Sequence, residues 1–279
     1  MRSLIRNTRR KLVEMPFTWS ILNSFYRFFY RFKFEKDLIP IQAKQKVLAE
    51  KEEILKQKFS NLTVAGGPFK GMKYPDFIAY GSAMYPKLIG CYESELNESL
   101  EQLLKNQYES IIDIGCAEGY YAVGVALRKP DSIVYAYDVE VKALDACKKM
   151  AELNKTSQNM RFGTFCSPET LINMNFEKKS LIFSDCEGYE MELFTPEVVK
   201  NLKNCDLIIE LHDLYTEKIS PSVIDAFSKS HHIKLVYSEN TFMKMRALNL
   251  IGDLTDDLIL NFFVERNGIM RWAIMTPKE

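Results

Sequence analysis

Carboxylates and glycines gather in one short stretch of the chain, residues 111–121, which reads IIDIGCAEGYY. An apolar run ends at Asp113 and is followed by Gly115, Glu118 and Gly119. A strand that passes through a glycine-containing turn into a helix allows a ligand to lie against the backbone. Because the carboxylates of Asp113 and Glu118 would repel a phosphate, they favour a ligand that carries positive charge.

Two common nucleotide-binding motifs do not fit this turn. A P-loop needs a lysine and a serine or threonine after its glycines, and none follows here. The dinucleotide motif GxGxxG has a second glycine where this chain has Ala117. S-adenosylmethionine has a sulfonium, an ammonium and an uncharged ribose, so it suits the acidic turn better.

The next apolar run supplies a further carboxylate. IVYAYDVE contains Asp138, nineteen residues after Gly119, where an acidic side chain can accept hydrogen bonds from ribose hydroxyls. Dehydrogenases use an acid in the same place, so a nicotinamide cofactor stays open as an alternative.

Two later strand ends supply candidates for catalysis. Asp185 follows one apolar run, and the segment ELHD at 210–213 ends the next. His212, with an ordinary pKa of about 6.5, is a candidate general base, and a structural histidine is the alternative. Asp185 and Asp213 offer hard oxygen ligands for Mg²⁺ or another divalent ion. Acidic groups that act on a sulfonium without any ion explain the same carboxylates.

The spacing of the apolar runs predicts the elements that bring these residues together. Helix-like stretches separate the runs, which lie near 110–114, 133–137, 160–165, 180–184, 205–211 and 233–237, and a last strand lies in MRWAIMTPK. This alternation predicts an α/β fold, a Rossmann-like, doubly wound and mostly parallel sheet with an N-terminal helical extension. In such sheets a ligand binds at the carboxyl ends of the strands.

We divide the chain into residues 1–104, a helical extension with a lid-like segment, and residues 105–279, the catalytic domain. Apolar residues at helical spacing predict a helix over residues 40–59. The segment YGSAMYPKLIGCYESEL is a candidate lid, with Tyr85, Lys87, Tyr92 and Glu93 as candidate lining residues. Ordinary packing and solvation are the alternative for these four side chains.

Composition narrows the class of protein. Lys and Arg number 37 and Asp and Glu also number 37, so the charge balance gives no reason to expect a nucleic-acid partner. The six cysteines form no CxxC pair, which favours a reduced, cytoplasmic compartment. Residues 1–35 mix basic and aromatic side chains. Residues 1–60 are therefore a candidate for peripheral membrane contact, or for packing on the catalytic domain or a second copy. No export signal or membrane span is expected.

Three segments together resemble a known family. IIDIGCAEGYYAVGVA, VYAYDVE and SDCEGYEMELF at 184–194 resemble the class I S-adenosylmethionine-dependent methyltransferases, and the last resembles the FkbM-type family. The resemblance covers about residues 105–215 and departs at Ala117, where a glycine is commoner. It implies methionine-moiety contacts around Asp113, Gly115 and Gly119, and a ribose contact at Asp138.

The resemblance also implies a reaction, the O-methylation of a hydroxyl on a sugar, glycan or related small molecule. Two alternatives stay open on the sequence. One is a nicotinamide-dependent oxidoreductase on the same kind of sheet. The other is a non-catalytic binding module that keeps the methyltransferase fold.

Overall fold

The computed structural model describes residues 43–247, 254–266 and 268–278, and the chain forms two compact units, Met1–Gln57 and Lys58–Glu279. Residues 43–58 are helical, which confirms the helix predicted there over its described part. Most of the segment considered for membrane or oligomer contact, residues 1–60, lies outside the described residues. No helix within the described ranges is long and apolar enough to cross a bilayer.

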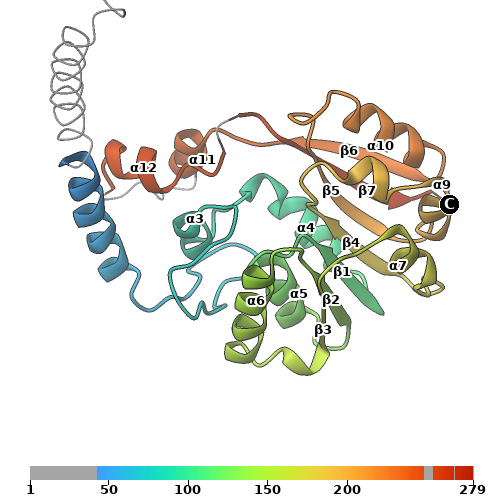
Figure 1. Cartoon of the computed structure of the whole chain (residues 1–279), viewed down its shortest axis with the longest axis horizontal. Coiled ribbons are helices and arrows are strands. Elements are labelled where there is room, and N and C mark those ends of the chain that lie inside the picture. Colours follow the sequence, from blue (N-terminus) through green and yellow to red (C-terminus); the bar gives the residue numbers. More distant parts are fainter. Residues whose placement is uncertain (1–42, 248–253, 267, 279) are drawn as a thin grey trace, which may run out of the picture. The chain divides into compact units, whose positions relative to one another are not determined.

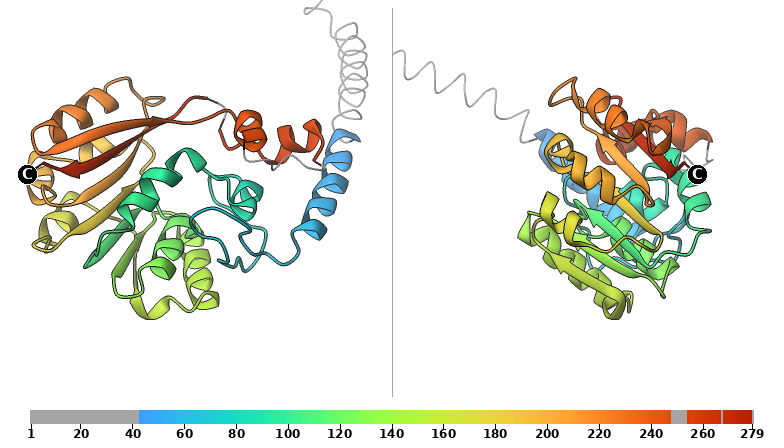
Figure 2. Two further views of the ribbon diagram at one scale, coloured as in Figure 1. Left: turned by 180° about the vertical axis from the view of Figure 1, so that it is seen from behind. Right: turned by 90° about the vertical axis from the view of Figure 1, so that its right-hand side faces the viewer.

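The second unit is built on a seven-stranded sheet (Figure 1). Its strands are β1 (Ser110–Ile114), β2 (Ile133–Tyr137), β3 (Met160–Gly163), β4 (Ser180–Ser184), β5 (Asp206–Leu211), β6 (His231–Tyr237) and β7 (Arg271–Pro277). They lie in the order β3-β2-β1-β4-β5-β7-β6. The first five pair in parallel, and β7 is antiparallel to both β5 and β6, between which it lies (Figure 2). The predicted fold class is confirmed.

Helices connect the strands and cover the sheet. They are α3 (Met84–Ile89), η1 (Ser94–Leu96), α4 (Asn97–Leu103), α5 (Tyr120–Arg128), α6 (Val141–Leu153), η2 (Ser157–Asn159), α7 (Pro168–Asn173), α8 (Glu190–Leu193), α9 (Pro196–Asn201), α10 (Ile219–Ser228), α11 (Thr241–Ala247) and α12 (Asp256–Phe262). Figure 1 shows α5 and α6 beside β1–β3, and α10 beside β6. α8 and α9 are separate helices, because Pro196 begins a new helix that the Thr195 side chain caps.

The core lies on both sides of the central strands. Ile111, Ile112 and Ile182 are fully buried, as expected for parallel strands that are covered by helices on both faces. This explains why these strands read in the sequence as continuous apolar runs.

The topology places one ligand-binding edge. From β1 the chain moves through β2 and β3 toward one side of the sheet, whereas β4 and β5 lie on the other side of β1. The connections after β1 and β4 therefore leave the sheet in opposite directions, and a crevice opens at their carboxyl ends.

The two compact units meet between residues 57 and 58, and the predicted division into residues 1–104 and 105–279 stays a prediction. Residues 58–104, with α3, η1 and α4, belong to the same compact unit as the sheet. The lid-like role of this segment stays a prediction.

Candidate functional site

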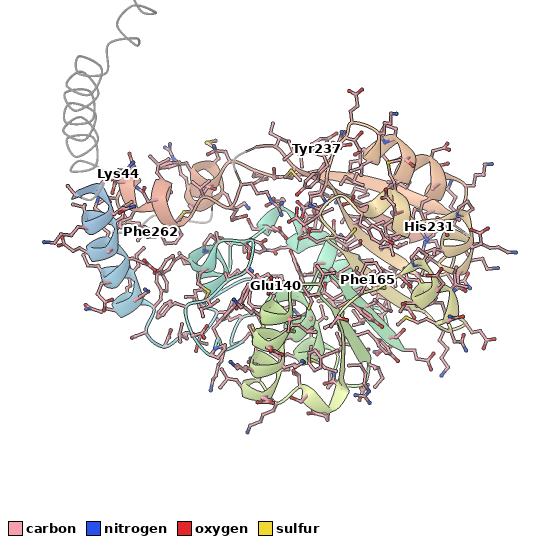
Figure 3. The ribbon with its side chains drawn as sticks, in the orientation of Figure 1. Lys44, Glu140, Phe165, His231, Tyr237 and Phe262 are labelled. Atoms are coloured by element: carbon pink, nitrogen blue, oxygen red, sulfur yellow. The ribbon has the colours of Figure 1, made fainter. Side chains whose placement is uncertain are left out.

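A cavity of about 530 Å³ lies at the carboxyl ends of the strands. The ends of β1, β2, β3 and β4 and the loops that follow them supply lining residues within 113–117, 137–140, 164–166 and 184–187. Residues 80–82, Lys87, Tyr92 and Trp272 line the cavity from elsewhere in the unit. Glu140 and Phe165, which follow β2 and β3, are labelled in Figure 3. Of the four lid residues proposed from the sequence, Lys87 and Tyr92 line the cavity, and Tyr85 and Glu93 do not.

The turn at 115–119 is held from two sides. Gly115 and Cys116 donate their backbone N–H groups to the Tyr137 carbonyl, at 2.8 and 2.9 Å. Gly115 has φ +86°, and a Cβ there would lie 1.7 Å from the backbone oxygen of Asp185. The glycine is therefore required by the close approach of the β1 and β4 ends, rather than by ligand access alone.

Ala117 is the position at which this turn departs from the methyltransferases that it resembles. It has φ +47°, in the left-handed region where a Cβ is disfavoured, so a glycine fits this position more easily.

We expect Ala117→Gly to raise the free energy of unfolding by up to about 1 kcal/mol, because relief of the backbone strain exceeds the added entropy of the unfolded chain. Urea denaturation measures the change. Glu187→Gly, at φ +52° in an exposed turn, is the matched comparison. A fall in stability for Ala117→Gly would show that the alanine methyl group packs favourably.

Asp138 braces the same turn. One carboxylate oxygen accepts the Ala117 N–H at 2.7 Å, and the other accepts the Glu140 N–H at 2.8 Å. The side chain is half-buried and lines the cavity. Each carboxylate oxygen can accept a second hydrogen bond, so Asp138 can still face a ribose while it holds the loop.

Asp113 lies at the cavity wall with one oxygen unengaged. The residue is 3% exposed, and its Oδ2 has no hydrogen-bond partner among the described residues. Burial, reinforced by the charges of Asp185 and Asp138, raises the pKa of Asp113 to about 8. A positively charged ligand group would satisfy the unengaged oxygen and stabilise the ionised form.

Glu118 does not face the cavity, contrary to its predicted role in binding a cationic ligand. Its side chain is buried against Lys87, with 2.5 Å between Nζ and Oε1. Its other oxygen accepts the Tyr80 N–H at 3.0 Å. The glutamate is neutralised by the lysine and holds the cavity wall at 80–82. This pairing could not be predicted from the sequence, because the two residues come from separate segments.

His212 lies between two carboxylates. Its Nδ1 bonds to Glu190, and its Nε2 is 3.2 Å from Asp185. Burial alone would lower the pKa of His212, but the hydrogen bonds to Asp185 and Glu190, with the charge of Glu210, raise it to about 10. The imidazole is therefore protonated at neutral pH. This differs from the neutral general base that the sequence suggested, and the neighbouring carboxylates are the reason.

Asp213 and Asp185 have different partners. Its carboxylate accepts hydrogen bonds from Arg271 Nε at 2.8 Å and from the Ser220 backbone at 3.0 Å. These bonds lower the pKa of Asp213 against the opposing effect of burial. The carboxylate is occupied by a structural ion pair, so the predicted metal pair of Asp185 and Asp213 does not form. The cluster with metal-ligand spacing among the described residues is Asp185, Glu187 and His212.

A buried ion-pair network lies close to the cavity. Arg266 bonds to both Glu93 and Glu210, and its guanidinium lies 5.8 Å from the Trp272 ring. Tyr121, which lines the cavity, donates its hydroxyl to Glu93. Glu210 thus bonds to the arginine, and its charge also helps to raise the pKa of His212. Arg266 and Trp272 were not among the candidate residues from the sequence. Only the order of the strands, which a single sequence does not state, brings them to this end of the sheet.

One family model and several solved structures are similar to parts of this chain. The family described as Methyltransferase small domain matches residues 97–176, which is under half of the chain. No curated protein matches the sequence. Precorrin-6y C5,15-methyltransferase from Geobacter metallireducens is a similar solved structure, with 13% identity, 64% of this chain and 89% of that chain covered, and a TM-score of 0.46.

Two further solved structures are similar at the same level. The O-methyltransferase TomG from Streptomyces achromogenes, in complex with SAM, has 12% identity, covers 68% of this chain and 83% of its own, and has a TM-score of 0.45. An rRNA methylase from Streptococcus thermophilus has 12% identity, with 66% and 97% covered and a TM-score of 0.44. Identities this low carry no information on substrate. The second unit has a Rossmann-like fold, a seven-stranded and mostly parallel sheet flanked by helices.

Proposed function

We propose that this protein is an S-adenosylmethionine-dependent methyltransferase whose acceptor is a hydroxyl on a sugar, glycan or related metabolite. The observation that carries the proposal is the cavity at the carboxyl ends of β1 and β4, with Asp113, Asp138 and Asp185 at three strand ends. When bound, the cofactor supplies a methyl group on a positively charged sulfur. The described residues fit it, because Asp113 Oδ2 is an unengaged buried acceptor and Asp138 reaches the cavity from β2.

Asp185 is the residue that we assign to the acceptor hydroxyl. Its side chain is 37% exposed in the cavity, and its partner His212 is only 5% exposed. The imidazolium fixes the carboxylate from behind and offsets part of its charge. Asp185 then accepts the hydrogen bond of the acceptor hydroxyl and orients an oxygen lone pair. His212 thus has a positioning role, and Glu190 holds its other ring nitrogen.

The lining suits a polyhydroxylated acceptor. Aromatic side chains of Tyr80, Tyr92 and Trp272 supply apolar faces for a sugar ring. Glu187, 66% exposed at the cavity rim, supplies a second carboxylate for hydroxyl groups. The acidic lining disfavours an anionic acceptor such as a nucleic acid backbone.

A divalent cation is a second candidate at the acceptor end. Asp185, Glu187 and His212 offer ligand atoms within 4.8 Å of one another, and Glu190 bonds to the opposite nitrogen of the imidazole. A carboxylate on the far nitrogen is common behind a metal-bound histidine. An ion at this place would have to displace the proton that the neighbouring carboxylates favour on His212.

The proposed cofactor site is tested by Asp138→Ala. We expect it to weaken binding of S-adenosylhomocysteine by about 1 to 3 kcal/mol, because the ribose loses an acceptor and Ala117 loses its brace. Isothermal titration calorimetry with S-adenosylmethionine, S-adenosylhomocysteine and NAD measures the affinities. Asp131→Ala, an exposed acid at the amino end of β2, is the control.

Each result of the calorimetry decides among the functions. Parent-like binding by a folded Asp138→Ala variant would refute the site assignment. Binding of NAD in place of S-adenosylhomocysteine would favour a nicotinamide-dependent oxidoreductase. Binding of no nucleotide would favour a non-catalytic module.

A further inference from the structure

A buried lysine reaches the wall of the cavity. The side chains of Lys87 and Glu118 are each 3% exposed and form an ion pair, but only Lys87 lines the cavity. Ser82 Oγ accepts a second hydrogen bond from Lys87 Nζ at 2.6 Å. The Tyr92 ring lies 4.7 Å from the same nitrogen. An ammonium has three N–H donors, and the hydrogen bonds described for Lys87 use two of them.

Among the described residues that line the cavity, Lys87 carries a positive charge and the other charged side chains are acidic. The acidic side chains are those of Asp113, Asp138, Glu140, Asp185 and Glu187. A lysine that served only to neutralise Glu118 would not need to reach the wall, because Glu118 itself lies behind it. The placement of Lys87 is therefore suited to an anionic group of a ligand.

Asp113 lies near enough to Lys87 for the two charges to interact. The lysine is one of the groups that lower the pKa of Asp113 against its burial and the charges of Asp185 and Asp138. Asp113 is nine-tenths buried, lines the cavity and has an unengaged oxygen. This end of the cavity thus presents one cation and one anion with hydrogen-bonding capacity to spare.

We propose that Lys87 completes the subsite for the α-amino-acid end of the cofactor by binding its carboxylate, beside Asp113, for which the resemblance implies a contact with the methionine moiety. This inference rests on the proposed function. A subsite made only of carboxylates would repel the cofactor's own carboxylate, whereas this pair matches both charges of a zwitterion. Glu118 and Ser82 are positioning residues that hold the lysine in place.

The test compares two probes that differ in the amino-acid end. S-adenosylhomocysteine has that end, and 5′-methylthioadenosine keeps the adenosine and the sulfur without it. The variant Lys87→Met/Glu118→Gln removes both members of the buried pair, so no charge is left buried alone. The control Lys70→Met removes an exposed lysine that does not line the cavity. Calorimetry gives the affinities, and thermal denaturation verifies that each variant is folded.

We expect the double variant to bind S-adenosylhomocysteine about 10- to 100-fold more weakly, as for loss of a hydrogen bond to a charged group. Its affinity for 5′-methylthioadenosine should stay within about 2-fold of the parent, and the control should bind both probes within about 3-fold. If the double variant does not fold, Lys87→Gln/Glu118→Gln, whose two amide groups can hydrogen-bond to each other, is used in its place, with the same loss expected for S-adenosylhomocysteine alone.

Other results overturn the subsite. An unchanged affinity of the double variant for S-adenosylhomocysteine would show that Lys87 does not meet the carboxylate. An equal loss for both probes would make the lysine a structural support of the wall. A parent protein that binds neither probe would instead refute the proposed function, and this outcome is distinct because it appears before any substitution is made.

Discussion

Asp185→Asn is expected to lower kcat for methyl transfer by about 10²- to 10³-fold and to leave the affinity for S-adenosylhomocysteine within about 3-fold of the parent. Asparagine keeps the size of the side chain, but its amide cannot hold the acceptor hydroxyl and its proton as a carboxylate can. It also loses the ion pair with His212 across 3.2 Å. Formation of S-adenosylhomocysteine measures the rate, with an acceptor found by screening simple glycosides.

Asp213→Asn is the matched control for Asp185→Asn. Its carboxylate bonds to Arg271 and Ser220, so we expect near-parent kcat with a small loss of stability. Equal losses of activity in the two variants would refute the special role of Asp185. Inhibition by EDTA that Mg²⁺ or Mn²⁺ reverses would favour the cation at Asp185, Glu187 and His212.

The pH profile of the parent separates the two roles of His212. The neighbouring carboxylates overcome the effect of burial and raise the pKa of His212 to about 10, so the imidazolium persists from about pH 6 to 8. We therefore expect no rise of kcat with an apparent pKa near 6.5. Such a rise, abolished in His212→Gln, would reinstate the neutral imidazole as the base.

Arg266→Met is expected to lower the free energy of unfolding by about 3 to 5 kcal/mol, the range for breaking a buried ion pair from one side. The guanidinium bonds to Glu93 and Glu210, whose side chains are each 1% exposed. Methionine fills much of the volume and leaves both carboxylates without a cation. Urea denaturation followed by circular dichroism measures the loss.

The loss in Arg266→Met should also depend on pH. Burial, with the charges of Asp185 and Glu93, raises the pKa of Glu210 to about 9, and Arg266 opposes the rise. Without the arginine the folded variant binds protons on these carboxyls more tightly than its unfolded chain does. In the parent Glu210 ionises near pH 9 beside Arg266, whereas in the variant it stays protonated to higher pH, so the stability of the variant relative to the parent should fall as pH rises above about 9.

Arg271→Met is the control for the buried network. Its ion pair with Asp213 is partly exposed, at 35% and 20%, and should contribute at most about 1 kcal/mol. If both arginine variants lose the same small amount of stability, the network around Arg266 is solvated. A loss that does not vary with pH would show that Glu93 and Glu210 stay ionised without their partner.

The sheet could be predicted from the sequence because its signals are local. The apolar runs near 110–114 and 180–184 coincide with β1 and β4, since strands that are buried on both faces need apolar residues throughout. The turn at 115–119 could be recognised in the same way, because glycine marks positive φ. The helices at 241–247 and 256–262 were not predicted, and no strong apolar period marks them.

The site was less predictable, because its charge state depends on partners that are distant in the chain. Glu118 was expected to face a cation and instead pairs with Lys87, 31 residues earlier. His212 was expected to be neutral, but Glu190 and Asp185 surround it from the β4 end of the sheet. Strand order brings such groups together, and a single sequence does not state which acid meets which base.

The antiparallel strand β7 has a consequence for the order in which the molecule can fold. It pairs with β5 on one side and β6 on the other, yet both neighbours precede it in the chain. During synthesis the edges of β5 and β6 therefore stay open until residues 271–277 emerge from the ribosome. The parallel half, β1 to β5, has its pairing partners earlier and can assemble first. Open strand edges invite pairing with other chains, so we expect the nascent protein to be most prone to aggregation in that interval.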